Sequence, residues 1–168
     1  HQRRVTELSI AIAREMGLDE QRIEGIRFGA TVHDIGKIHI PAEILNRPGH
    51  LTEMEFGIIK THAEVGYEIV EEIDFPWPVA DIIPQHHERI DGSGYPQGLK
   101  ENEIILEAKI VAVADVVEAM SSHRPYRPGL GIEMALEEVE KHSGKFYDPE
   151  IVRICIHLFK NNLFSFSE

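Results

Sequence analysis

The sequence has almost no cysteine and no long apolar run, the features that would indicate a disulfide-bonded or membrane protein. Cys155 is the only cysteine, so no internal disulfide can form, and its place in the apolar run IVRICIHLF predicts a buried structural thiol. No run approaches the roughly 18 consecutive apolar residues of a membrane span, and the opening residues HQRRVTELS lack the apolar stretch of an export signal. We therefore expect a cytoplasmic protein without membrane contact.

Basic residues are also scarce. The chain has 17 Lys and Arg against 29 Asp and Glu, a formal net charge of -12. This balance argues against a broad surface for a DNA or RNA polymer. An anionic ligand would need positive charge from another source, and the 10 histidines could supply it by binding metal ions.

Strand-like alternation is missing as well, whereas apolar residues recur at helical spacings of three and four. We therefore expect an all-α fold, a bundle of about seven helices. The 168 residues fit a single domain. Because the chain begins with His1 rather than Met, we expect it to be a fragment of a longer protein with an upstream domain. The expected helices cover residues 3–16, 19–36, 52–73, 79–87, 103–122, 131–142 and 149–160.

Local signals support several of these helices. Thr52 with Glu55 is typical of a capping box, and Asp148 followed by Pro149 predicts the start of the last helix. The stretch AKIVAVADVVEAM is apolar on nearly every face, which predicts a buried central helix. Asp115 then lies in the core, where a carboxylate needs a partner, either in a salt bridge or cap contact or at a metal.

Other polar residues also fall at or within apolar helices: His33, Asp34, His62, His86 and His87. Taken singly, each is more often a hydrogen-bonded core residue or a surface residue than a ligand. Taken together, such side chains from several helices can converge on a pair of cations. The two oxygens of Asp34 could then bridge the two ions.

The ordered motifs resemble those of the HD-GYP subfamily of the HD phosphohydrolase superfamily. They are HDIGKIHIP at 33–41, HHERIDGSGYP at 86–96, VAVADVVEAM at 111–120 and RPYR at 124–127. The resemblance runs from His1 to about residue 160. It implies an HD-domain helical bundle with the GYP loop at the metal site, and an upstream sensory or receiver domain.

The resemblance also implies two divalent metal ions, iron or manganese. One ion would be held by His1, His33, Asp34 and Asp115, and the second by His62, His86 and His87 with Asp34 shared. A metal-bridging hydroxide would be the nucleophile, so no catalytic Ser or Cys is needed. Asp34 and Lys37 are then the implied catalytic residues.

The implied substrate is cyclic di-GMP, a bacterial second messenger, hydrolysed to linear pGpG and in some members on to GMP. Some relatives prefer hybrid cyclic dinucleotides. Without the motifs, Lys37 would be read as a helix-end cation and the two arginines as partners in surface salt bridges. The implied substrate-binding residues are Lys37, Gly94, Tyr95, Pro96, Arg124 and Arg127.

Two positions depart from the family pattern. Glu118 stands where Asp is common, and His123 stands where Asp is usual. Glu118 keeps the charge but reaches one methylene further, so we expect its contact behind the metal ligands to shift.

Two other functions remain open. The first is a general HD phosphohydrolase acting on nucleotides or phosphomonoesters, against which the GYP loop and RPYR argue. The second is a catalytically weak module that binds cyclic dinucleotides or docks a diguanylate cyclase domain through the GYP loop. A homodimer is a further expected assembly.

Overall fold

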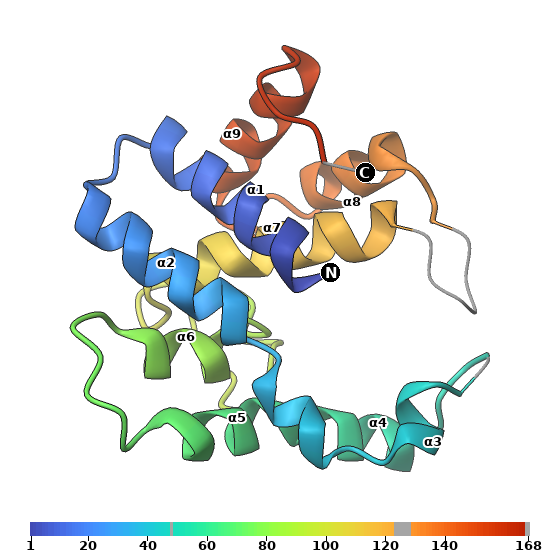
Figure 1. Cartoon of the computed structure of the whole chain (residues 1–168). Helices are drawn as coiled ribbons and strands as arrows, with labels where there is room; N and C mark the ends of the chain where they lie inside the picture. Colours follow the sequence, from blue (N-terminus) through green and yellow to red (C-terminus); the bar gives the residue numbers. More distant parts are fainter. Residues whose placement is uncertain (48, 123–128, 167–168) are drawn as a thin grey trace.

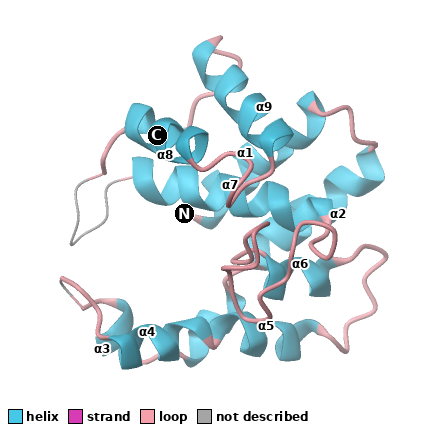
Figure 2. Ribbon diagram, turned by 180° about the vertical axis from the view of Figure 1, so that it is seen from behind, coloured by secondary structure: helices cyan, strands magenta, loops and turns pink. Residues whose placement is uncertain are grey.

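The computed structural model describes residues 1–47, 49–122 and 129–166. Within these ranges every regular element is a helix and no strand is present, as Figure 2 shows. The prediction of an all-α bundle is therefore confirmed. No helix in the described ranges is long and apolar enough to cross a membrane.

The elements follow one another along the chain with short connections except after α6. The longest helix, α7, follows the irregular segment that contains the GYP loop. The elements are α1 (Gln2–Glu15), α2 (Glu20–Val32), the 3-10 helix η1 (Ile35–His39), α3 (Ala42–Leu45), α4 (Glu53–Lys60), α5 (His62–Val70), α6 (Val79–Gln85), α7 (Leu106–Ser121), α8 (Ile132–Lys141) and α9 (Pro149–Lys160).

Helix α7 is the centre of the fold. It packs against α1, α2, α6, α8 and α9, and Figure 1 shows it crossing the middle of the molecule. Val113, Ala114 and Val117 are fully buried on it, which confirms the prediction of a central apolar helix. A smaller apolar cluster, formed by Val70, Val79 and Ile83, joins α5 to α6.

The predicted helix starts are confirmed by their caps. The Thr52 hydroxyl accepts a hydrogen bond from the Glu55 amide, and the Glu55 carboxylate accepts one from the Thr52 amide. The Asp148 carboxylate accepts a hydrogen bond from the backbone of Glu150 at 2.9 Å. Such caps satisfy amides that the first helical turn leaves without partners.

The boundaries differ from expectation at several places: α5 ends at Val70 instead of 73, α6 ends at Gln85 instead of 87, and α7 begins at Leu106 instead of 103. Two further differences affect the site. Residues 52–73 were expected as one helix, but Thr61 interrupts it, with α4 ending at Lys60 and α5 beginning at His62. Helix α2 ends at Val32 instead of continuing to Gly36, and η1 follows it. As a result His33, Asp34 and His62 lie at helix ends, where side chains from different helices can meet.

A close backbone approach fixes the position of the HD segment. Gly36, in η1, packs directly on α5, where a Cβ atom at this position would lie 1.9 Å from the His62 carbonyl oxygen and 2.6 Å from the Gly66 amide nitrogen. Only glycine allows this contact without movement of the backbone. The contact places Asp34 beside His62.

Candidate metal centre

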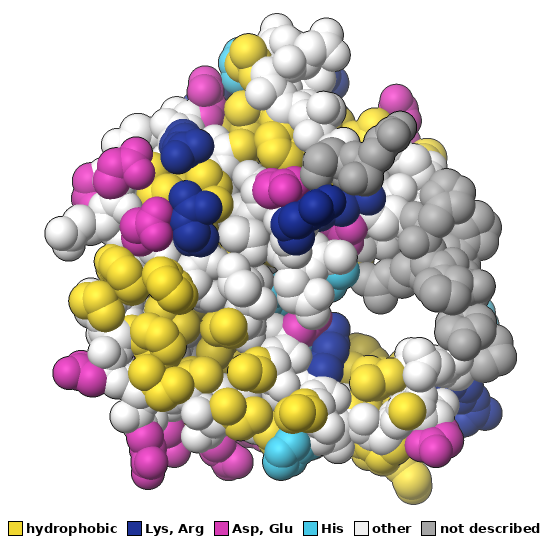
Figure 3. Space-filling model, viewed as in Figure 1, with side chains coloured by type: hydrophobic (Ala, Val, Ile, Leu, Met, Phe, Trp, Pro, Cys, Tyr) yellow, Lys and Arg dark blue, Asp and Glu magenta, His cyan; other side chains and the backbone are white. Residues whose placement is uncertain are grey.

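The structure brings all seven predicted metal ligands into two adjoining groups. In each group, one ligand atom from every residue lies within 4.8 Å of the others. Figure 3 shows histidine, acidic and basic side chains gathered at the inner edge of a hollow near the centre of this face. The first group is His1, His33 and Asp115, and the second is Asp34, His62, His86 and His87.

Asp34 joins the two groups. Its Oδ1 lies 3.5 Å from Nε2 of His62, whereas its Oδ2 lies 3.5 Å from Nε2 of His33 and 3.7 Å from Nε2 of His1. Oδ1 of Asp34 and Nε2 of His33 are buried without a hydrogen-bond partner in the described part of the chain. Buried polar atoms almost always have partners. A bound cation would be the partner that these two atoms lack.

Three histidines share one orienting contact. Nδ1 of His33, His62 and His86 each lies 2.6 Å from the carbonyl oxygen three residues earlier in the chain. The nitrogen must donate because the carbonyl can only accept. This hydrogen bond leaves the lone pair on Nε2, and Nε2 is the nitrogen that faces Asp34.

Burial keeps the second group of imidazoles neutral. It lowers the pKa of His62, lowers the pKa of His86 to about 3, and lowers the pKa of His87 well below its ordinary value. An uncharged imidazole is the form that binds a metal. At neutral pH these rings are therefore ready to act as ligands.

Both aspartates are held in the ionised form. Burial acts to raise the pKa of Asp34, but the neighbouring His33 and the Lys37 ammonium outweigh it and lower that pKa. Burial also opposes ionisation of Asp115, yet the hydrogen bond from His1 and the nearby His33 bring its pKa well below the ordinary value. The Asp115 side chain is only 14% exposed, as predicted for a carboxylate on the central helix.

His1 lies between carboxylates. Its Nε2 is 3.1 Å from Asp115 Oδ1, and its Nδ1 is 2.5 Å from Glu118 Oε2. Burial lowers the pKa of His1, but the hydrogen bonds to both carboxylates raise it to about 9. Glu118, 2% exposed, also accepts a hydrogen bond from Ser122 at 2.6 Å, so its longer side chain orients His1 from behind.

Lys37 contacts the aspartate that joins the two groups. Its Nζ is 2.6 Å from Asp34 Oδ2, and its side chain is 34% exposed, so the ammonium can reach a ligand in solvent. The predicted phosphate contacts Arg124 and Arg127, and the departure at His123, lie outside the described residues.

Tyr95 of the GYP loop covers one metal-ligand candidate. Its ring stacks on the His87 imidazole with 4.7 Å between ring centroids, and its amide donates to the His87 carbonyl at 3.3 Å. On the α4 side, Lys60 lies 5.2 Å from the Tyr95 ring centroid, and the Phe56 ring lies 6.2 Å from it. Neither α4 residue could be assigned to the site from the sequence, since only the tertiary fold brings them to the loop.

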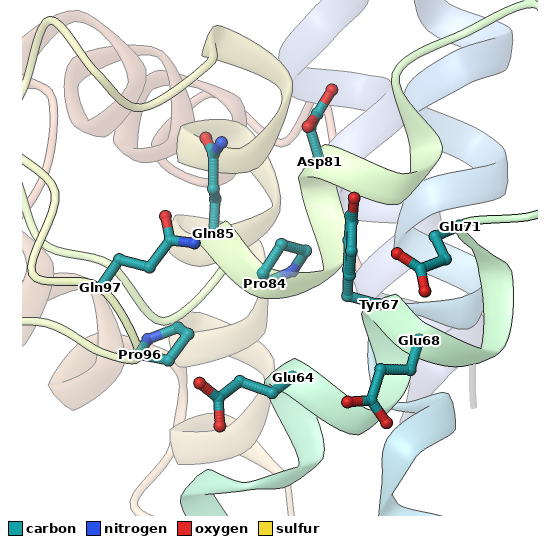
Figure 4. Close-up of a pocket in the computed structure, with 9 residues that line it drawn as sticks. All are labelled: Glu64, Tyr67, Glu68, Glu71, Asp81, Pro84, Gln85, Pro96 and Gln97. Carbon is teal, nitrogen blue, oxygen red and sulfur yellow. The ribbon is translucent and has the colours of Figure 1, made fainter.

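Pro96 faces a different pocket. A cavity of about 580 Å³ lies between α5, α6 and the GYP loop, and none of its lining residues is a candidate metal ligand. Figure 4 shows Glu64, Glu68 and Asp81 around it. This negative lining disfavours a phosphodiester, so the predicted role of Pro96 in substrate binding has no support from this pocket.

The family comparison agrees with the geometry. The family model described as "HD domain" matches residues 1–151. The chain belongs to the HD domain family. The motifs at residues 33–41 and 86–96 and the related proteins also confirm its resemblance to the HD-GYP subfamily.

Curated proteins similar to this HD domain carry phosphodiesterase names. It is 49% identical to a Thermotoga maritima protein named cyclic di-GMP phosphodiesterase, over 95% of this chain and 44% of that protein. It is 39% identical to a Vibrio cholerae protein named 3'3'-cGAMP-specific phosphodiesterase 1, over 79% of this chain and 31% of that protein. The chain thus spans less than half the length of either relative.

Solved structures show the same fold. An HDG"Y"P protein from Bdellovibrio bacteriovorus superimposes with a TM-score of 0.78 at 24% identity, covering 94% of this HD domain and 50% of that chain. The implied helical bundle with an irregular GYP segment beside the histidines is therefore confirmed as the architecture.

Proposed function

We propose that this HD domain is a metal-dependent phosphodiesterase that hydrolyses cyclic di-GMP to linear pGpG in bacterial signalling. The observation that carries the proposal is the position of Asp34, whose two oxygens face two separate groups of imidazoles. A carboxylate in this position suits a pair of divalent cations, with His1, His33 and Asp115 on one side and His62, His86 and His87 on the other.

We expect iron or manganese, because these are the metals that the resemblance to the HD-GYP subfamily implies. Mixed imidazole and carboxylate ligands suit several first-row metals, and cellular supply decides much of the selection. When bound, the two cations would supply Lewis acidity to activate water and to stabilise charge on a phosphodiester. The described ligands include no thiolate, so the protein's own contribution is to hold the neutral imidazoles of the second group and the two ionised aspartates in place.

Lys37 is a protein cation that we expect to bind the substrate. Its ammonium lies against Asp34 and is partly exposed, so it can donate a charge-assisted hydrogen bond to a phosphate oxygen. The implied contacts from Arg124 and Arg127 would add two more cations. Tyr95, over His87, would form part of the cleft wall next to the reacting phosphate.

A hybrid cyclic dinucleotide is the second candidate substrate. The Vibrio cholerae relative named 3'3'-cGAMP-specific phosphodiesterase 1 is 39% identical to this HD domain, so the metal ligands alone do not choose between the two nucleotides. The cytoplasmic location, the upstream sensory or receiver domain, cyclase docking and a homodimer stay predictions.

The experiment compares substrates with one metal-loaded preparation. Protein purified without oxygen and loaded with Fe²⁺ or Mn²⁺ is given cyclic di-GMP, 3'3'-cGAMP, a deoxynucleoside monophosphate and dGTP, and products are separated by chromatography. We expect pGpG from cyclic di-GMP, with loss of activity on chelation and recovery on metal addition. Turnover of dGTP or the monophosphate alone would support a general HD phosphohydrolase instead, and tight nucleotide binding without hydrolysis would support a binding module.

A further inference from the structure

Glu88 is a buried acid that the metal centre does not use. It follows the two histidines at the end of α6 and is only 3% exposed. Its Oε1 accepts hydrogen bonds from the amides of Gln97 at 2.7 Å and Gly98 at 3.1 Å, and its Oε2 accepts one from Leu99 at 3.0 Å. Three backbone donors offset much of the cost of burying a carboxylate.

These bonds fold the GYP loop back on the segment that carries His87. The three amides belong to the far arm of the loop, which pairs with the near arm at Asp91 and Lys100. At the turn of the loop, Gly94 packs so closely that a Cβ atom would lie 2.4 Å from the Glu88 Cα. Glu88 therefore contacts the loop through its side chain and through its own backbone.

His87 depends on this loop more than the other histidines do. His33, His62 and His86 are each oriented by a hydrogen bond from Nδ1 to a helix carbonyl. No such bond joins the His87 ring to a carbonyl of the described residues. The His87 ring instead lies between His86, with 4.0 Å between centroids, and the Tyr95 ring of the GYP loop.

We propose that Glu88 is a positioning residue: by holding residues 97–99, it keeps Tyr95 stacked on His87 and so fixes the imidazole that completes the second metal group. The proposal rests on the proposed metal-dependent function. Glu88 touches neither metal nor substrate in this role. Its effect passes through the loop to a single ligand, which predicts a selective loss at one of the two metal sites.

The test compares Glu88→Ala and Glu88→Gln with Glu107→Gln in the full chain. Glu107 is a matched control because it is also buried, at 7% exposure, but pairs with Arg22 at 2.7 Å on another side of the fold. Mn²⁺ binding is titrated by calorimetry, and hydrogen exchange of the amides of residues 95–99 is followed by mass spectrometry. Neither readout requires turnover.

For Glu88→Ala we expect only one of the two Mn²⁺ affinities, that of the second metal group, to fall about 10- to 100-fold, the other to stay within about twofold, and residues 95–99 to exchange faster. Glu88→Gln keeps one accepting oxygen, so an intermediate loss is expected, and this variant decides the test if Glu88→Ala does not fold. Glu107→Gln should change neither readout.

Two results overturn the proposal. One is unchanged Mn²⁺ affinity and exchange in both Glu88 variants, and the other is an equal loss of both affinities, which would indicate general destabilisation. Failure of the proposed function looks different: the selective Mn²⁺ loss is observed, but the wild-type protein hydrolyses no cyclic dinucleotide.

Discussion

Asp34 lies between α2 and η1 and His62 begins α5, yet Oδ1 of Asp34 lies 3.5 Å from Nε2 of His62. The other oxygen of Asp34 faces His33 and His1. A carboxylate that divides its oxygens in this way can serve two cations at once.

Replacing Asp34 by Asn removes the shared charge with little change in shape. We expect Asp34→Asn to hold no more than one metal per chain by elemental analysis and to lose at least about a hundredfold in kcat/KM, because several kcal/mol of metal assistance disappear. Asp74→Asn, an exposed aspartate between α5 and α6, is the control. Two metals per chain in Asp34→Asn would contradict the bridging role.

The approach of Gly36 to α5 predicts a second effect. Ala at this position would force the His62 carbonyl to move, so Gly36→Ala should destabilise the fold by about 1–3 kcal/mol and weaken metal binding beside His62. Thermal unfolding and metal content measure the two effects. Gly57 has open space around its Cβ position and is the control. Gly57→Ala should raise the free energy of unfolding by about 1 kcal/mol, because Ala favours the helix more than Gly does.

Lys37 should act on the substrate rather than on the metals. We expect Lys37→Gln to lower kcat/KM for cyclic di-GMP about 10- to 100-fold, the loss of one charge-assisted hydrogen bond, while two metals per chain remain. Lys141→Gln, on the exposed side of α8, is the matched control. Equal activity of Lys37→Gln and wild type would remove Lys37 from the substrate site.

The lone thiol should be inert in the native protein. Cys155 is fully buried in the core, and burial raises its pKa to about 12. The thiol therefore stays protonated at pH 8, and a disulfide reagent should modify it only after unfolding in guanidinium. Rapid stoichiometric modification of the native protein would show that α9 opens readily or packs differently.

Much of the fold could be predicted because its signals are local. The capping box at Thr52 and the cap at Asp148 lie within one helical turn of the groups they bind. The break at Thr61 could not be predicted, since the sequence there has neither Pro nor Gly. Thr61 itself keeps helical dihedral angles, so no local breaker marks this boundary. The packing of Gly36 on the His62 carbonyl at the start of α5 is a tertiary contact.

The candidate site also contains residues that the sequence reveals and residues that only the folded structure reveals. Six of the seven ligand candidates were found because their residue types are unusual in apolar helices and match a known motif order, whereas His1 was implied by the family resemblance alone. Lys60 and Glu88 were missed because their partners, the Tyr95 ring and the amides of residues 97–99, lie on other segments. Only the folded loop reveals these contacts.

The most direct test of the two-metal claim is anomalous X-ray diffraction from crystals of the Mn²⁺-loaded protein. The account predicts two peaks about 3.5–4 Å apart, one beside Oδ1 of Asp34 and His62 and the other beside Oδ2 of Asp34 and His33. A single peak, or two peaks that do not share Asp34, would contradict it.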